Sequence, residues 1–234
     1  MTSPSKPVEL QPRSSLFGHK TPVTVLAVSK SFSTLLSASS DGCVLLWDVN
    51  RLEFVRKLTH GRPVECARIN DVSGDIMLCR GQKVALYTLN GESILDQNVC
   101  GETGHDDYIH SCAFYEGVGN EWLEQTLIFT GHRRGVVNIW RKVVRSGKGG
   151  KGKGKEAAGG WELELVKRLD HVDLKRGLDA SDARFGRGGG KTDAGISCIR
   201  PMEKVVYTGD EDGRVVSLQF HEDFRKAHAN EITV

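Results

Sequence analysis

The chain has 234 residues, long enough to bury the core of one or two domains and too long for a small disulfide-stapled peptide. Hydrophobic residues make up 38% of it and charged residues 26%, the proportions of a globular protein rather than a disordered chain. Its 32 basic and 30 acidic residues leave a net charge of +2, too small for a global field that would hold nucleic acid or an anionic membrane. Any basic partner site is therefore expected to be local.

The sequence shows no signal for membrane insertion or secretion. No stretch reaches the roughly 18 uncharged apolar residues of a transmembrane helix, and the N-terminus lacks the apolar core of a signal peptide. We therefore expect a cytoplasmic protein whose six cysteines are reduced, small, buried hydrophobes. No two cysteines lie two residues apart, so the spacing predicts no metal site and no cofactor.

Short runs rich in Val, Leu and Trp begin near residue 22 and are separated by polar turns. Residues 22–29, 34–39 and 43–49 predict three β-strands, and 51–58 supplies a fourth. Between the second and third runs, Ser40-Asp41-Gly42 favours a tight hairpin, because glycine accepts the positive φ of such a turn. No segment shows sustained helical periodicity, which indicates an all-β fold.

The same set of runs returns three times, in 63–99, in 108–140 with a delayed fourth strand at 161–169, and in 194–220. Aligning the third strand of each repeat places four residues at one position: Trp47, Tyr87, Trp140 and Leu218. The first two are 40 residues apart, which matches the ~40–45 residue period of a propeller blade. The pattern predicts a partial β-propeller of about four blades, each an antiparallel four-stranded sheet.

The expected domain is a propeller segment over 16–220, flanked by tails at 1–15 and 221–234. Two insertions explain the longer repeats. Residues 145–160 hold seven Gly and five Lys or Arg, and with 172–193 they are expected to be flexible because they have little apolar surface to bury. Within the N-terminal tail, residues 7–12 are a candidate outer strand of a preceding blade. The predicted blades are 16–58, 59–100, 106–170 and 194–220.

The first repeat contains Gly18-His19, then Ser39-Ser40-Asp41-Gly42, then Trp47-Asp48, an arrangement that resembles the WD-repeat family. The resemblance implies a structural tetrad in which Trp47 donates to Ser39, Ser39 contacts His19, and Asp41 orients His19. Such a chain satisfies polar groups inside a blade. A His-Ser-Asp hydrolase triad is not favoured, because no strained G-x-S-x-G elbow accompanies these residues.

Later repeats depart from this pattern. Gly81 and Arg134 stand where the turn aspartate belongs in repeats two and three. Repeat four keeps Asp212-Gly213 but has Leu218 in place of the tryptophan. The complete tetrad is therefore expected in repeat one only, with packing alone holding the other three.

Longer motifs point to a more specific family, and they cover roughly residues 16–144 and 161–220. They are LFGHKTPVTVLAVS, LLWDVNRLEFVRKL, INDVSGDIMLCRG, NEWLEQTLIFTGHRRGVVNIWRKV and VVYTGDEDGRVVSLQF. Together these motifs look like the C-terminal WD-repeat region of BEACH-domain proteins. The resemblance implies a non-catalytic protein-interaction scaffold acting in vesicle trafficking, lysosomal sorting or selective autophagy. A BEACH domain does not fit before residue 16, so we expect a fragment, a truncated gene model or a small relative. The expected partners are proteins, with peripheral association with endomembranes and self-association through exposed blade flanks as further possibilities.

An alternative function uses the basic loop at 145–155, whose cations are Arg145, Lys148, Lys151, Lys153 and Lys155. These charges could hold an anionic membrane or RNA electrostatically. No aromatic residue is interleaved for base stacking, so specific nucleic-acid binding is not expected and a solvated loop is the simpler interpretation.

Two other patterns carry no predicted chemistry. Gly190-Lys191-Thr192 matches the end of a P-loop, but Phe185 stands where the first glycine is needed. Five histidines lie near predicted turns without a His-x-x-x-His or His-Glu pair, and are interpreted as loop and turn residues: His60, His105, His110, His132 and His171.

Overall fold

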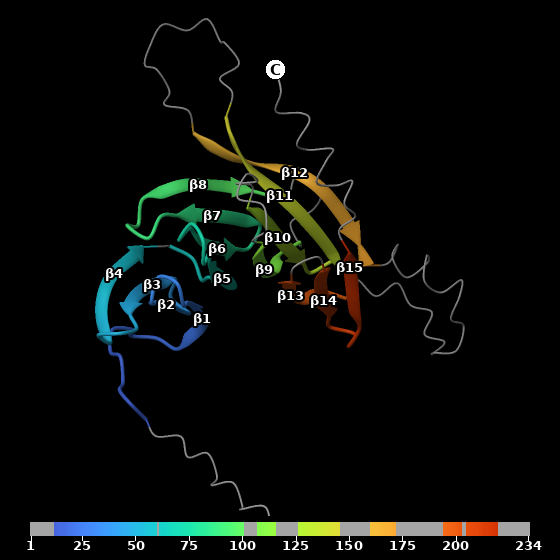
Figure 1. The fold of residues 1–234 in the computed structure, drawn as a ribbon. Coiled ribbons are helices and arrows are strands. Elements are labelled where there is room, and N and C mark those ends of the chain that lie inside the picture. The colour runs from blue at the N-terminus through green and yellow to red at the C-terminus, as the bar shows by residue number, and fades with distance from the viewer. Residues whose placement is uncertain are drawn as a thin grey trace, which may run out of the picture.

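The structure is a computed structural model, and it describes residues 12–59, 61–100, 107–115, 126–145, 160–171, 194–202 and 205–219. Fifteen strands in these ranges form four antiparallel sheets, in each of which strands consecutive in sequence are neighbours (Figure 1). The all-β propeller-type fold predicted from the sequence is confirmed. We refer to the sheets as blades one to four.

Each blade is a simple meander. Blade one contains β1 (Val23–Ser29), β2 (Thr34–Ser39), β3 (Cys43–Asp48) and β4 (Glu53–Thr59). Blade two contains β5 (Cys66–Ile69), β6 (Ile76–Arg80), β7 (Lys83–Tyr87) and β8 (Ser93–Asn98). Blade three contains β9 (Ile109–Tyr115), β10 (Leu127–His132), β11 (Val136–Val144) and β12 (Trp161–Asp170). Blade four has three strands in the described residues: β13 (Ile196–Met202), β14 (Val205–Asp210) and β15 (Val215–Gln219).

The strand register repeats from blade to blade. The aligned third-strand residue faces an aliphatic partner on the second strand in every sheet: Leu35 with Trp47, Ile76 with Tyr87, Ile128 with Trp140, and Val206 with Leu218. In blades one to three the pairing with the fourth strand also shifts at this residue. The sequence alignment of the four repeats is therefore the structural alignment.

Equivalent tight turns join the second and third strands of blades one, three and four. Gly42, Gly135 and Gly213 occupy one position in these turns, with φ of 81°, 74° and 80°. Each donates its N–H to the carbonyl three residues earlier. A side chain at this φ would be strained, so the turn requires glycine.

The blades follow one another in an arc whose innermost strands are β1, β5, β9 and β13, with β4, β8 and β12 on the outside (Figure 1). The apolar faces of neighbouring sheets form a separate core at each junction. Leu36 and Leu46 pack with Ile76 between blades one and two, whereas Phe129 and Ile139 pack with Ile196 between blades three and four. Apolar burial between blades is therefore what orders the arc.

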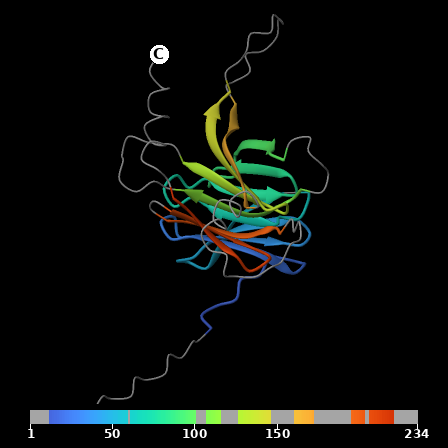
Figure 2. The ribbon, with the colours of Figure 1, turned by 90° about the vertical axis from the view of Figure 1, so that its right-hand side faces the viewer.

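Polar contacts add specific links at the outer part of the junctions. The Gln97 side chain on β8 donates to the Leu163 carbonyl at 2.9 Å and accepts from the Leu163 N–H at 2.7 Å, which joins β8 to β12. Lys142 of blade three bonds Asp75 of blade two at 2.7 Å. Figure 2 shows the β11–β12 hairpin rising beyond the other strands of the molecule. At its tip the Arg145 N–H donates to the Gly160 carbonyl at 2.7 Å.

Candidate functional site

A directional hydrogen-bond chain runs through blade one. The Trp47 indole N–H donates to Ser37 Oγ at 2.8 Å, and Ser37 Oγ lies 2.7 Å from His19 Nε2. On the other side of the ring, His19 Nδ1 lies 2.9 Å from Ser39 Oγ, whose hydroxyl donates to Asp41 Oδ1 at 2.5 Å. Because Ser39 donates to Asp41, it accepts from His19 Nδ1–H, which leaves Nε2 to accept from Ser37.

The structure brings the four predicted residues into this one chain, but two of the expected contacts are wrong. Trp47 donates to Ser37 and not to Ser39, and Asp41 reaches His19 only through Ser39. Ser37 is the functional member that the sequence interpretation missed. It lies two residues before Ser39 on β2, and the period of two in a strand places both side chains on one face.

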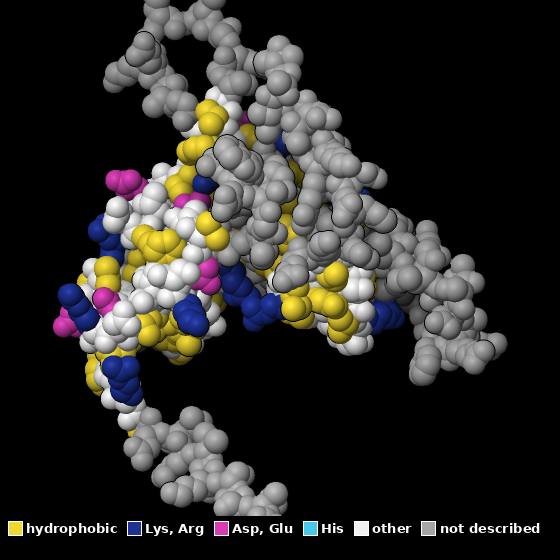
Figure 3. Space-filling model, in the orientation of Figure 1, with side chains coloured by type: hydrophobic (Ala, Val, Ile, Leu, Met, Phe, Trp, Pro, Cys, Tyr) yellow, Lys and Arg dark blue, Asp and Glu magenta, His cyan; other side chains and the backbone are white. Residues whose placement is uncertain are grey.

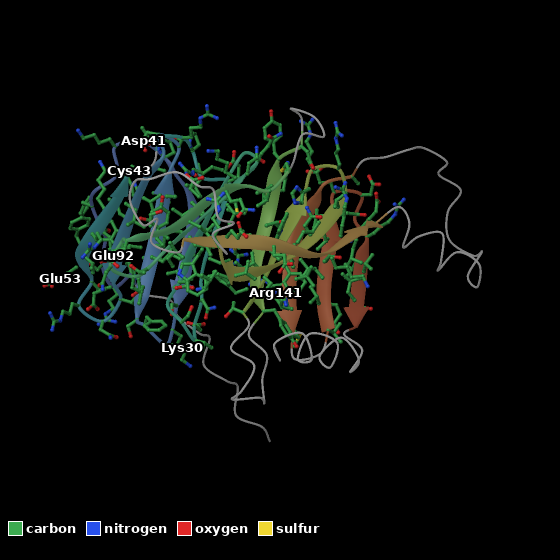
Figure 4. The ribbon with its side chains drawn as sticks, turned by 90° about the horizontal axis from the view of Figure 1, so that it is seen from above. Lys30, Asp41, Cys43, Glu53, Glu92 and Arg141 are labelled. Atoms are coloured by element: carbon green, nitrogen blue, oxygen red, sulfur yellow. The ribbon has the colours of Figure 1, made fainter. Side chains whose placement is uncertain are left out.

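Asp41 lies at the edge of the blade that carries the tight turn, together with Cys43 and opposite Lys30 (Figure 4). The hydrogen bond from Ser39, and then that from the Cys43 backbone N–H, hold the pKa of the Asp41 carboxyl below its usual value. The Asp41 carboxylate is therefore ionised in the folded protein at neutral pH.

Blade three contains a second network of the same kind, so the expectation that it relies on packing alone is wrong. The Trp140 indole N–H donates to Thr130 Oγ1 at 2.9 Å, and this hydroxyl lies 2.9 Å from His132 Nε2. His132 Nδ1 lies 3.4 Å from Asp107 Oδ2. Thr130 and His132 occupy the register positions of Ser37 and Ser39, so the histidine here comes from the second strand.

Blade four carries a shorter network. His171 Nε2 lies 2.7 Å from Thr208 Oγ1, and His171 Nδ1 lies 3.6 Å from Asp210 Oδ2. Asp210 Oδ1 also accepts the Asp212 and Arg214 N–H groups of the turn. In blade two the corresponding position is Leu78, which is fully buried and has no hydroxyl for such a network.

Burial also corrects the interpretation of the histidines. His132 is the last residue of β10 and His171 follows β12, and both are buried rather than exposed in turns. His110 is partly exposed and lies 3.7 Å from Glu211. His60 and His105 lie outside the described residues.

The networks of blades three and four have a signal in the sequence. The i, i+2 pairs Thr130/His132 and Thr208/Asp210 repeat the spacing of Ser37/Ser39.

Four of the six cysteines are buried as expected, whereas Cys43 is partly exposed and Cys198 exposed. Cys66, Cys79 and Cys112 converge from β5, β6 and β9 with their sulfurs within 4.8 Å of one another. The hydrogen bond with Cys112 is the main cause that raises the pKa of Cys66 and Cys79, while their thiols lower the pKa of Cys112. Sequence spacing could not show this cluster, because only the stacking of blade two on blade three forms it.

A polar pocket of about 790 Å³ opens on blade two, beside Tyr108 at the start of blade three. Its lining combines three cationic side chains with two carboxylates and a tyrosine: Gly61, Arg62, Pro63, Glu65, Arg80, Gly81, Gln82, Lys83, Asp96, Asn98 and Tyr108. Asp96 bonds Arg80 at 2.8 Å and lies 3.7 Å from Lys83, while Glu65 accepts the Gly81 N–H at 2.9 Å. Arg80 Nε is buried and lacks a hydrogen-bond partner among the described residues.

The outward faces of the two terminal sheets expose apolar side chains. On β1 these include Leu26 and Val28, and on blade four they include Met202, Tyr207 and Val215. Figure 3 shows apolar side chains gathered over β13–β15.

Of the predicted electrostatic contact residues, Arg145 is exposed and lies 3.6 Å from Glu162. Lys148, Lys151, Lys153 and Lys155 lie outside the described residues, as do most of the insertions 145–160 and 172–193, residues 7–11 of the candidate N-terminal strand, and the P-loop-like stretch at 185–192. No helix in the part of the chain that the structure describes is long and apolar enough to cross a membrane.

The four meander blades and their repeated register define the fold class, which is an arc of a β-propeller. The family model described as "WD domain, G-beta repeat" matches residues 10–48. Among solved structures, the computationally designed Ika4 protein aligns with a TM-score of 0.57 at 18% identity, covering 91% of this chain and 100% of that one. The WD40 domain of SCAP from fission yeast aligns with a TM-score of 0.56 at 11% identity, over 87% of this chain and 43% of that one.

Over most of its length the chain is homologous to BEACH-domain proteins, as its motifs indicated. It is 28% identical to Beige protein homolog 1 of Schizosaccharomyces pombe over 97% of this chain and 8% of that protein. It is 31% identical to the human WD repeat- and FYVE domain-containing protein 4 over 90% of this chain and 7% of that protein. The human Lysosomal-trafficking regulator is 32% identical over 59% of this chain and 4% of that protein. The chain thus spans less than a tenth of the length of these relatives.

Proposed function

We propose that the chain is a non-catalytic protein-interaction scaffold that binds an acidic segment of a partner protein in the polar pocket on blade two. The observation that carries this proposal is the pocket itself, in which Arg62, Arg80 and Lys83 outnumber the carboxylates Glu65 and Asp96. A partner carboxylate there would meet cationic donors that blade two and the segment before β5 hold in place. WD40 propellers in general mediate protein–protein interactions, and the fold supports the same use here.

The buried Nε of Arg80 gives the pocket a preference for an acceptor. Asp96 already orients the Arg80 guanidinium through Nη2, so the side chain is positioned before a ligand arrives. A guanidinium N–H that is buried without a partner costs free energy, and a ligand oxygen or a bound water would recover it. The pocket is therefore better suited to an Asp- or Glu-containing peptide than to an apolar one.

The cellular role we propose is in vesicle trafficking, lysosomal sorting or selective autophagy, in the cytoplasm and peripherally on endomembranes. Its support is the homology to BEACH-domain proteins, one of which is named a lysosomal-trafficking regulator. We also propose self-association as a second mode of interaction, supported by the apolar side chains that β1 and blade four expose.

Peptide selection tests the pocket directly. A random peptide library displayed on phage would be selected against the full chain, and one enriched peptide would be labelled for fluorescence anisotropy. We expect Asp- and Glu-rich peptides, and we expect Arg62→Glu and Lys83→Glu to weaken binding by at least about tenfold. Lys57→Glu reverses an exposed charge on β4 and is the matched control. Selection of apolar peptides, or equal loss in all three variants, would contradict the pocket assignment.

The adhesive alternative at 145–155 makes a different prediction. Binding through that loop would survive charge reversal in the pocket, would be lost on replacing residues 146–159, and would show on phosphatidylserine vesicles or RNA as well as on peptides.

A further inference from the structure

Three potential ligand groups converge at the edge of the sheets between blades two and three. Cys100 follows β8, Asp107 precedes β9 and His132 ends β10. Their exposed fractions are 7%, 6% and 0%. Cys100 Sγ lies 3.5 Å from His132 Nδ1, Asp107 Oδ2 lies 3.4 Å from the same nitrogen, and all three donor atoms lie within 4.8 Å of one another.

Asp107 forms hydrogen bonds with His132 and with the Arg134 backbone, but these do not satisfy every polar atom of the trio. One ring nitrogen carries either one proton or one lone pair, so Nδ1 cannot serve the sulfur and the carboxylate equally. A hydrogen bond between imidazole and carboxylate is usually about 2.7–2.9 Å when charge-assisted, whereas the Asp107 contact is 3.4 Å. The other oxygen, Asp107 Oδ1, is buried without a hydrogen-bond partner among the described residues.

The distances match the edges of a tetrahedral zinc site. With Zn–N and Zn–O near 2.0 Å and Zn–S near 2.3 Å, the tetrahedral angle puts nitrogen and oxygen about 3.3 Å apart and nitrogen and sulfur about 3.5 Å apart. The observed separations are 3.4 and 3.5 Å. We propose that Cys100, Asp107 and His132 bind Zn²⁺ through Sγ, a carboxylate oxygen and Nδ1, with water as the fourth ligand.

Charge favours this trio over the other cysteine cluster. One thiolate, one carboxylate and a neutral imidazole balance Zn²⁺, which suits a buried site. Three thiolates from Cys66, Cys79 and Cys112 would leave the same ion with a net negative charge inside an apolar core. Binding at the mixed site displaces the Cys100 thiol proton to solvent as the Zn–S bond forms.

The surroundings of His132 are those of a metal-ligating histidine. Its Nε2 lies 2.9 Å from Thr130 Oγ1 and 3.1 Å from Asn138 Nδ2. A proton on Nε2 that is donated to Thr130 leaves the Nδ1 lone pair for the metal, the usual division of roles between the two ring nitrogens. Asn138 Oδ1 has no partner among the described residues, and a flip of this amide would turn it toward the Nε2 proton.

Cobalt substitution tests the proposal on the full chain. The purified protein, reduced and freed of metal with a chelator, would be titrated with Co²⁺ and then with Zn²⁺ against a chromophoric competitor. We expect one equivalent of Co²⁺ to produce a thiolate-to-cobalt charge-transfer band and tetrahedral d–d absorption, both abolished by Zn²⁺. A folded wild-type chain without this band would overturn the proposal before any variant is made.

Variants assign the ligands. Cys100→Ala should remove the charge-transfer band and weaken Zn²⁺ binding at least tenfold, since even groups that only support a ligand contribute that much. Cys112→Ala controls for the other sulfur cluster, and Asp210→Asn alters the His171–Asp210 pair of blade four, which belongs to neither three-ligand cluster of the described residues. Both controls should bind Co²⁺ and Zn²⁺ like the wild type.

A charge-transfer band that survives Cys100→Ala and disappears in Cys112→Ala would place the metal at the three cysteines instead. If Cys100→Ala does not fold, the near-isosteric Asp107→Asn takes its place, and unchanged Zn²⁺ affinity in that variant would reject the site.

Discussion

Ser37 connects the two rings of the blade-one network, because one hydroxyl serves both the Trp47 indole and the His19 imidazole. Ser37 and Trp47 are buried, whereas His19 is partly exposed, so the indole in particular cannot exchange this hydroxyl for bulk water. A polar group with a buried partner matters more to stability than its size suggests, since its loss leaves the Trp47 N–H desolvated and unpaired.

Ser37→Ala should therefore lower the free energy of unfolding by about 1–3 kcal/mol. Ser40→Ala removes an exposed hydroxyl three residues along the chain and should have little effect. Urea denaturation followed by tryptophan fluorescence measures both. Equal midpoints for the two variants would show that the Trp47–Ser37–His19 contacts add nothing to stability.

Asp41 makes the stability of blade one depend on pH. Its pKa is lowered in the folded chain by the hydrogen bonds from Ser39 and the Cys43 N–H, so folding favours the ionised carboxylate. The stabilisation is complete above the unfolded value of 3.8 and is lost as the pH falls through the lower folded pKa. Asp41→Ala should melt below the wild type at pH 6, and the two melting curves should converge on acidification. A difference that grows toward low pH would contradict this assignment.

At the scale of elements, a side chain of β8 forms hydrogen bonds with the outer strand of blade three. Gln97 on β8 makes two hydrogen bonds to the backbone of Leu163 on β12. The outer strand of a sheet has backbone N–H and C=O groups that no further strand pairs, and the Gln97 amide forms hydrogen bonds with two such groups of β12. The apolar core beneath it contains Leu95 and Leu163.

Gln97→Met keeps the side-chain volume and removes both hydrogen bonds, and it should destabilise the chain by about 1–2 kcal/mol. Glu92→Met, at an exposed position before the same strand, is the matched control. Hydrogen exchange of the Leu163 amide should become faster in Gln97→Met and stay unchanged in the control. Unchanged exchange would mean that the apolar core alone holds the two strands together.

At the scale of the whole molecule, the geometry of the β11–β12 hairpin determines which shorter turn can replace the Gly/Lys-rich insertion. Arg145 and Gly160 are already hydrogen-bonded neighbours, so joining them directly would leave no residues for a turn. Replacing 146–159 by Asn-Gly supplies the two-residue turn that a hairpin prefers. The change in unfolding free energy should be about 1 kcal/mol or less, because loop-closure entropy varies slowly with length. A loss of cooperative unfolding would show that the insertion is part of the packed structure.

The exposed apolar faces of the terminal sheets predict association between copies of the chain. Sedimentation velocity over a hundredfold concentration range should show a species heavier than the monomer. Leu26→Lys combined with Val28→Lys should shift the distribution toward the monomer, because both side chains are exposed on β1. Lys57→Glu, on β4, should leave it unchanged. A compact monomer at every concentration would contradict self-association.

The sequence by itself determined the repeat and the class of fold. Alternating apolar runs, turn glycines such as Gly42, and the third-strand residues Trp47 and Trp140 are local signals, and the local geometry of a meander blade follows from them. The register then matched the sequence alignment because a shift by one residue would turn every apolar side chain to the wrong face.

Only the tertiary structure decided the sites. Whether Trp47 meets Ser37 or Ser39 depends on the stagger of β3 against β2, which residue types alone do not specify. The convergence of Cys100 with His132 joins residues 32 positions apart, and it arises where blade two ends and blade three begins. Such junctions are set by the packing of whole sheets, so the chemistry they bring together has no short-range signature in the chain.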